Sequence, residues 1–316
     1  MTSQTNPLVG ERCVALGASS PRLESYPNRA MKLGTLDIDR ALPIRERRLV
    51  GPWCFLDRFG PLTFAEGKPM DVAPHPHIGL QTVSWLLDGE IVHDDSLGSS
   101  SVLRPGGVNV MTSGAGIAHT EQTPRQHSGR LNGVQLWVAL PGAERHRAPG
   151  FAHVAEAPRL EQPGAVISVF AGRLLDATAP VIYHSELLGA DLAVHRAGRV
   201  PLPLRPDFEC ALLVLDGDVA VNGQALEPRF LHYLGSARTE AEFTSREGGR
   251  VLLVGGPPFP EAILMWWNFV ARTPEEIAAA RADWEGGHRF GDVPAYAGSR
   301  LPAPPLVRMA RPEPAS

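Results

Sequence analysis

The sequence predicts an all-β protein built of two antiparallel β-barrels followed by a C-terminal helix. Short apolar runs rich in β-branched and aromatic residues recur along the chain, and glycine and proline, 32 and 30 of its 316 residues, separate them. One strand–turn–strand pattern also occurs once in each half. Because glycine and proline are spread evenly and stay below the level of low-complexity sequence, they indicate turns between short strands.

The first strands with chemical interest lie between residues 71 and 122. Pro74 and Pro76 exclude a helix interior and a central ladder position, so residues 71–77 are predicted to begin a strand or to form an edge strand. The run at 80–87 favours a strand that ends at the Asp-Gly turn 88–89. The glycine-containing stretch 113–116 would turn the chain sharply into the next strand.

Two short pairs of polar residues stand in these predicted strands: His75 with His77, and His119 with Glu121. Residues spaced i, i+2 leave a strand from one face, so two such pairs on facing strands would bring three imidazoles and one carboxylate together. This donor set suits iron(II), manganese, nickel, copper or zinc, and the absence of thiolate argues against a structural zinc site. A single pair is weak support, because buried histidines are often only hydrogen-bonded. Two pairs predict a metal site.

The second half repeats the first without these ligands. Residues 213–221 resemble 86–92 as apolar strand, Asp-Gly turn, acidic residue and apolar strand, which indicates an internal duplication. No HxH occurs in this half, and we expect structural or surface roles for the isolated His184, His195 and His232. One metal ion per chain is therefore predicted. The expected divisions are an N-terminal segment (1–29), a metal-binding domain (30–141), a linker (142–164), a degenerate domain (165–270), and a helix with a proline-rich tail (271–316).

One helix is predicted near the C-terminus. Residues 273–276, Thr-Pro-Glu-Glu, form a capping box with proline at the first helical position. Ile277, Ala280 and Trp284 then share one face, and the glycine pair 286–287 would end the helix. We expect this apolar face to dock on the protein itself.

Charge and cysteine content exclude several classes of protein. The net charge is −4, and the one basic cluster, at 45–48, is too short to predict nucleic-acid binding. The three cysteines, Cys13, Cys54 and Cys210, are far apart and odd in number, which is typical of a reducing compartment. We expect no secretory signal in residues 1–20 and no membrane span, so the predicted location is the cytoplasm.

Six stretches of the first half form a recognisable set: GPWCFLDRFGP (51–61), HPHIGLQTV (75–83), HDDSLG (93–98), RPGG (104–107), MTSGAGIAHTE (111–121) and GVQLWV (133–138). In order and spacing they resemble the N-terminal domain of pirin, a member of the cupin superfamily. The resemblance implies a bicupin fold, a C-terminal helix that packs on the first domain, and metal ligation by His75, His77, His119 and Glu121.

The resemblance also implies two functions. Some pirins are flavonol (quercetin) 2,3-dioxygenases, which use one metal ion, preferably iron(II), and dioxygen to open an aromatic substrate with loss of carbon monoxide. Glu121 is then the candidate base for the substrate hydroxyl. Other pirins are metal-dependent, redox-sensitive partners of transcription regulators or metabolic enzymes. An apolar cavity above the metal would favour the enzyme.

Four positions depart from the family pattern. Relatives carry an acid where this chain has Gln81, an aspartate at Gly107, a tryptophan at Val110 and a histidine at Asn132. None of these changes removes a ligand, but they are predicted to alter the surroundings of the metal and hence the substrate. A metal-binding cupin that acts on an unrelated small molecule is therefore a third hypothesis.

Overall fold

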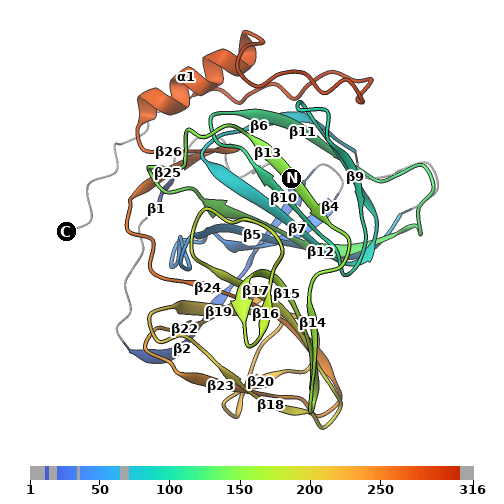
Figure 1. The fold of residues 1–316 in the computed structure, drawn as a ribbon, viewed down its shortest axis with the longest axis vertical. Helices are drawn as coiled ribbons and strands as arrows, with labels where there is room; N and C mark the ends of the chain where they lie inside the picture. The colour runs from blue at the N-terminus through green and yellow to red at the C-terminus, as the bar shows by residue number, and fades with distance from the viewer. Residues whose placement is uncertain (1–10, 14–19, 34–35, 65–70, 307–316) are drawn as a thin grey trace.

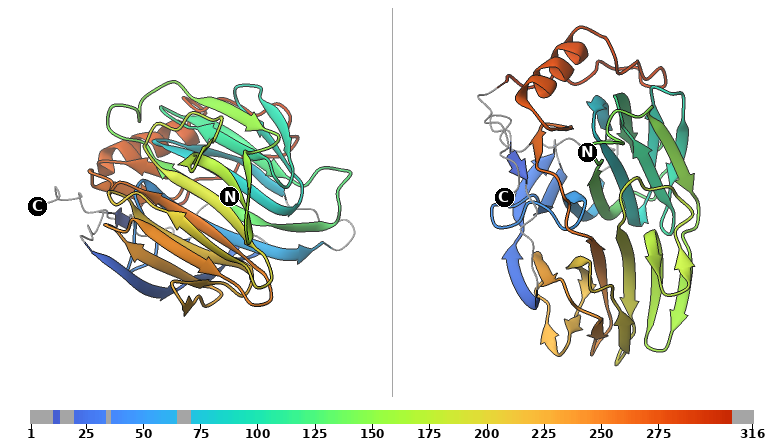
Figure 2. Two further views of the ribbon diagram at one scale, coloured as in Figure 1. Left: turned by 60° about the horizontal axis from the view of Figure 1, so that its bottom comes forward. Right: turned by 60° about the vertical axis from the view of Figure 1, so that its left-hand side comes forward.

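The fold was analysed in a computed structural model that describes residues 11–13, 20–33, 36–64 and 71–306. The end of the predicted proline-rich tail, beyond residue 306, and most of residues 1–19 lie outside this range. The chain forms two stacked β-domains with a helix at one end (Figure 1). Figure 2 shows the same stacking from two further sides. Apart from one isolated bridge, the strand pairs in the described residues are antiparallel.

The first half is a sandwich of a seven-stranded and a four-stranded sheet. In spatial order the larger sheet contains β13 (Gly150–Val154), β10 (Val108–Thr112), β7 (Leu80–Gly89), β12 (Arg130–Ala139), β5 (Trp53–Thr63), β4 (Leu36–Leu42) and β3 (Arg29–Leu33). The smaller sheet contains β6 (Asp71–His77), β11 (Ile117–Gln122), β8 (Ile91–Asp95) and β9 (Ser100–Leu103).

The second half repeats this sandwich. Its larger sheet contains β14 (Arg159–Gln162), β15 (Ala165–Leu174), β17 (Leu188–Val194), β24 (Gly249–Gly256), β19 (Glu209–Gly217), β22 (Phe230–Gly235) and β2 (Pro21–Pro27), with β16 (Ala177–Thr178) paired to β15. Its smaller sheet contains β18 (Arg199–Pro203), β23 (Glu240–Thr244), β20 (Ala220–Val221) and β21 (Gln224–Ala225).

The predicted all-β architecture of two repeated domains and a C-terminal helix is confirmed, with one correction to its geometry. Each half is a jelly-roll sandwich of two open sheets and not a closed barrel. The strand β2, from the expected N-terminal segment, pairs with β22 of the second half. The positions of the domain boundaries stay a prediction.

The two large sheets share one core. Trp85 on β7 stacks on Phe170 on β15, with ring centroids 5.2 Å apart. The Trp85 indole also donates a hydrogen bond of 2.7 Å to Asp191 on β17, whose carboxylate binds Arg250. The same buried cluster includes side chains of both halves, such as Leu136 and Leu213. Apolar burial of this extent joins the halves into one body.

The helix α1 (Pro274–Glu285) begins and ends where the sequence predicts. The Thr273 hydroxyl accepts a hydrogen bond from the N–H of Glu276, and Gly286 is the C-cap. The apolar face of α1, formed by Ile277, Ala280 and Trp284, lies in one buried cluster with Ile78 and Ala118 of the first half. The helix therefore docks on the first half, as Figure 1 shows. None of the helical structure in the described ranges has both the length and the apolar character needed to cross a bilayer.

A third sheet returns the chain to the first half before the helix. It consists of β1 (Glu11–Cys13), β25 (Ile263–Trp266) and β26 (Phe269–Ala271). The N–H of Val270 donates to the carbonyl of Ile78, one residue beyond His77, at 3.0 Å. This contact fixes the end of β6 that carries the histidines.

Candidate metal centre

Three of the four predicted ligands meet at the pairing of β6 with β11. The two strands are antiparallel, and His119 lies directly opposite His75. Ring centroids are 4.3 Å apart for His75 and His119, 5.0 Å for His77 and His119, and 5.1 Å for His75 and His77. One nitrogen of each ring lies within 4.8 Å of the other two. We call these three residues the histidine triad.

The triad is fully buried, and this burial sets its charge. Desolvation, reinforced by the neighbouring imidazoles, holds the pKa of His77 and of His119 well below the ordinary 6.5. Burial lowers the pKa of His75 in the same way. The three rings are therefore neutral near neutral pH, which is the form that binds a metal ion.

The free nitrogens of the triad point to a missing partner. The Nδ1 atom of His75 lies 2.9 Å from the carbonyl oxygen of Ala73, and that of His119 lies 3.3 Å from Nδ1 of His93. Their Nε2 atoms are buried and have no hydrogen-bond partner among the described residues. Buried polar atoms are rarely left in this state, so the arrangement fits a metal ion held through Nε2.

Two residues that the sequence analysis did not single out extend the site behind His119. The Nε2 atom of His93 on β8 lies 3.2 Å from a carboxylate oxygen of Asp95. The other oxygen of Asp95 accepts hydrogen bonds from the N–H groups of Leu97 and Ser99. The His93 ring stacks on Phe151, with centroids 4.1 Å apart. The H-x-D spacing on one strand was the available signal for this pair.

The hydrogen bonds that run from Asp95 through His93 to His119 select one tautomer for each of these two imidazole rings. An ionised carboxylate only accepts, so His93 donates to Asp95 from Nε2 and accepts at Nδ1. Partial burial acts to raise the pKa of Asp95. The hydrogen bonds from His93 and from backbone N–H groups prevail and hold this pKa below its usual range. His119 then donates from Nδ1, which leaves its Nε2 lone pair for a metal. This is how outer ligands orient metal-binding histidines.

Glu121, the predicted fourth ligand, is buried on β11 two residues after His119. A β-bulge lies between these two residues in the pairing with β6, because Glu121 is opposite Val72. The carboxylate of Glu121 is not in the group of atoms that lie within 4.8 Å of one another. Ligation by Glu121 stays a prediction.

The positions that depart from the family pattern serve different contacts. The Gln81 side chain donates to Thr112 and to the carbonyl of Ile182, and it accepts from the N–H of His184. Gln81 thereby attaches the loop before β17 to the first half. Val110 lies in the core between the large sheets.

The other two departures, Gly107 and Asn132, lie in different surroundings. A Cβ atom at Gly107 would stand 2.9 Å from the carbonyl oxygen of Val154, so only glycine fits there without a shift. Asn132, opposite Asp88 on β7, has a buried side-chain oxygen without a partner in the described part of the chain.

The isolated histidines of the second half stand apart from the triad. His232 is buried and bonds to the Ser25 hydroxyl and the carbonyl of Glu227. His195 is exposed, and His184 contacts Arg147. These contacts fit the structural and surface roles that were expected.

Comparison with known proteins identifies the fold and the family together. Residues 35–138 match the family model described as Pirin, and residues 189–291 match the Pirin C-terminal cupin domain. A Pseudomonas aeruginosa protein named "Putative quercetin 2,3-dioxygenase" is 46% identical over 288 residues, which are 90% of each chain. This chain belongs to the pirin family.

Other pirins and a solved structure agree with this assignment. A "Pirin-like protein" of Caulobacter vibrioides is 38% identical over 269 residues, 83% of this chain and 92% of that one. The crystal structure of quercetin 2,3-dioxygenase from Acinetobacter baumannii superposes with a TM-score of 0.87 at 43% identity, covering 92% of this pirin and 97% of that chain. The jelly rolls are therefore cupin domains, as the resemblance implied.

Proposed function

We propose that this pirin is a metal-dependent dioxygenase that opens flavonol-type substrates with dioxygen. The observation that carries the proposal is the histidine triad, whose neutral buried rings leave Nε2 of His75 and His119 without a partner among the described residues. Two similar proteins, from Pseudomonas aeruginosa and Acinetobacter baumannii, carry the name of this activity. Metal binding in a cupin domain is required by this proposal and also by the alternative given below, a metal-dependent protein partner.

The metal that we propose is iron(II), one ion per chain, held by the triad with Glu121 as the fourth ligand. Manganese, nickel, copper and zinc fit the same donors. A bound ion of this kind supplies Lewis acidity and, for iron, the redox chemistry of oxygenases with open coordination positions.

The protein residues would supply proton transfer and orientation. We assign Glu121 as the base that takes the proton from the substrate hydroxyl, because it is the one carboxylate in the predicted ligand set. His75, His77, His119 and Glu121 are buried, which would keep water away from this transfer. His93 and Asp95 hold the His119 ring at a fixed orientation through the two hydrogen bonds described above.

The test is oxygen uptake by iron-loaded protein with quercetin as substrate. Luteolin is the matched control, because it lacks only the 3-hydroxyl that the base would deprotonate. Uptake with quercetin and none with luteolin is expected. If neither quercetin nor any other flavonol supports uptake, the dioxygenase proposal fails. The alternative is then a metal-dependent protein partner without turnover, which pull-down with and without metal would test.

We further propose that the protein works in the cytoplasm. The proposal rests on its cysteines: Cys54 and Cys210 are buried thiols that form no disulfide, as is usual in a reducing compartment. Cell fractionation with detection of the intact chain is the direct test.

A further inference from the structure

The two jelly rolls correspond strand for strand. In the large sheets, β13-β10-β7-β12-β5-β4-β3 matches β2-β22-β19-β24-β17-β15-β14, and in the small sheets β6-β11-β8-β9 matches β18-β23-β20-β21. The end of β6, with His75 and His77, thus corresponds to the end of β18. The second domain has no histidine on β18 or on β23, the counterpart of β11.

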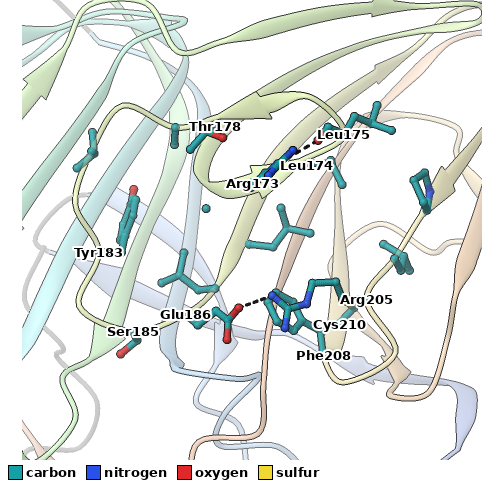
Figure 3. A pocket seen from close by; sticks show the side chains of 17 residues that line it. Arg173, Leu174, Leu175, Thr178, Tyr183, Ser185, Glu186, Arg205, Phe208 and Cys210 are labelled. Carbon is teal, nitrogen blue, oxygen red and sulfur yellow. Dashed lines mark hydrogen bonds and ion pairs between the residues drawn. The ribbon is translucent and has the colours of Figure 1, made fainter.

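A cavity of about 700 Å³ opens at this same end of the second domain (Figure 3). Its lining includes Pro203, the last residue of β18, followed by Leu204 and Arg205, and Cys210 near the start of β19. Leu204 and Cys210 also belong to the interior core of this jelly roll. The cavity therefore lies at the end of the second domain that corresponds to the end of the first domain where the histidine triad lies.

The wall of the cavity is more apolar than polar. Five leucines, Val181 and the ring of Phe208 line it. The hydroxyl of Tyr183 already donates to the carbonyl of Phe170 at 2.8 Å, and that of Ser185 to the carbonyl of Ala139 at 3.0 Å. Burial raises the pKa of the Cys210 thiol to about 12, so it carries no charge near neutral pH.

Arg205 and Glu186 at the mouth bind one another, whereas Arg173, the third charged residue of the lining, donates to the carbonyl of Leu175 at 3.4 Å. Arg205 forms hydrogen-bonded ion pairs with Glu186 and with Asp207, and its guanidinium lies 4.2 Å from the centroid of the Phe208 ring. Figure 3 shows Arg205 and Glu186 side by side, joined by their ion pair. An anionic ligand would have to compete with both carboxylates for this guanidinium, whereas a neutral ligand leaves the pairs intact.

The cavity is also held open by contacts with the first domain. The loop 179–187 forms one of its walls, and Gln81 binds this loop at the carbonyl of Ile182 and the N–H of His184. A preformed pocket of this size lowers the ordering cost of binding and accommodates a drug-sized molecule.

We propose that this cavity is a second ligand site, which takes a neutral and mostly apolar aromatic molecule without a metal ion. The ligand lies among the leucines and Phe208, and Arg205, held by two carboxylates, offers an anion no free guanidinium. The site is independent of the histidine triad and of any turnover there.

The test uses two fluorescent probes that differ in charge. N-phenyl-1-naphthylamine is neutral, and 8-anilino-1-naphthalenesulfonate adds a sulfonate to the same rings. The neutral probe should bind saturably, one per chain, in wild-type protein and equally in metal-free His77→Ala protein. The affinity for the sulfonate should be lower than that for the neutral probe by about tenfold or more, because Glu186 and Asp207 do not release Arg205. Tighter binding of the sulfonate would overturn the ligand class proposed.

Filling the cavity should abolish binding. Val181→Trp places an indole in the space, while its neighbour Ile182→Trp is the matched control, since Ile182 is 76% exposed and does not line the cavity. Val181→Trp should weaken the neutral probe by about tenfold or more, and Ile182→Trp should leave it unchanged. If Val181→Trp does not fold, Thr178→Trp replaces it as the cavity-filling variant, because Thr178 lines the cavity and is exposed. Equal binding by filled variant and control would refute the site.

Discussion

At the residue scale, metal binding depends on which nitrogen each imidazole presents. Asp95 accepts from backbone N–H groups on one oxygen and from His93 on the other, so the direction of every hydrogen bond behind His119 is fixed. The cost of turning the His119 ring before an ion binds is thereby removed in advance. This fixed arrangement of donors and acceptors extends from the Asp95 carboxylate through the His93 and His119 rings to the proposed metal.

Replacing His93 by phenylalanine tests this role. The new ring can keep the stacking on Phe151, but it cannot accept the hydrogen bond from His119. We expect iron(II) affinity to fall by about 10–100-fold, as measured by competition with a chelator. The control is His195→Phe, on an exposed histidine, which should not change the affinity. Unchanged binding in His93→Phe would show that the chain of hydrogen bonds is only structural.

Glu121→Gln tests the proposed base. An amide oxygen can still reach a metal, but it cannot take a proton from the substrate, so quercetin turnover should fall by about 10²–10⁴-fold while iron content stays measurable. The readout is the oxygen-dependent loss of flavonol absorbance at matched iron loading. Equal rates for the two proteins would remove Glu121 from this role.

The site was predictable in part. The i, i+2 spacing of His75 and His77 needs only a strand to place both rings on one face, and pairing with β11 adds His119. The i, i+2 spacing does not indicate a β-bulge, so the pairing of Glu121 with Val72 could not be predicted. The H-x-D spacing marks His93 and Asp95 as a pair, but only the pairing of β8 with β11 shows that they lie beside His119.

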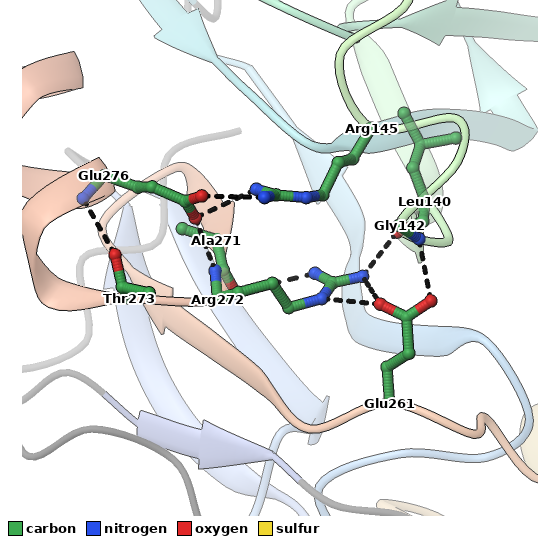
Figure 4. Close-up of polar contacts among 8 residues, drawn as sticks. All are labelled: Leu140, Gly142, Arg145, Glu261, Ala271, Arg272, Thr273 and Glu276. Carbon is green, nitrogen blue, oxygen red and sulfur yellow. Dashed lines mark hydrogen bonds and ion pairs between the residues drawn. The ribbon is translucent and has the colours of Figure 1, made fainter. Parts of the chain in front are cut away.

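At the scale of elements, the contacts of α1 with the linker show how the C-terminal segment is fixed (Figure 4). Glu276 binds Arg145 through both oxygens and accepts from the N–H of Arg272. Arg272 in turn binds Glu261 and the carbonyl of Leu140. The glutamate of the capping box thus joins the helix to the first domain in addition to helping start it.

This network predicts a dependence on acid. Partial burial acts to raise the pKa of Glu276, but the bonds from Arg145 and from the N–H of Arg272 prevail and hold it below its ordinary 4.5. The resulting stabilisation is present above about pH 4.5 and is lost as the pH falls through the folded pKa. Glu276→Gln should therefore lower the melting temperature at pH 7, and its difference from wild type should shrink in acid. A difference that stays constant with pH would contradict this account.

The elements themselves were predictable to different degrees. Local signals, the capping box and the glycine pair, defined α1 because they act within a few residues. The pairing of β2 with β22 joins residues about two hundred positions apart, and no local pattern specifies it. Alternation along the strands indicates a buried face, but it does not distinguish a closed barrel from a two-sheet jelly roll.

At the scale of the whole molecule, the two duplicated domains share one core but differ in the side chains of their small sheets. The large sheets of both halves share one core, so each half supports the other, while the small sheets diverge in chemistry. In the sequence the repeat is visible only at the Asp-Gly hairpin, since the other equivalent strands keep their order in space and not their residues. Among the described residues, only the first domain has a cluster of side chains that could hold a metal ion.

The most direct test of this account is the metal content of the purified protein, measured by elemental analysis of wild type, His77→Ala and His232→Ala. We expect one transition-metal ion per chain in wild type and in His232→Ala, whose buried histidine lies in the second domain, and essentially none in His77→Ala. Two ions per chain, or full retention of metal in His77→Ala, would contradict the assignment of the histidine triad as the metal centre.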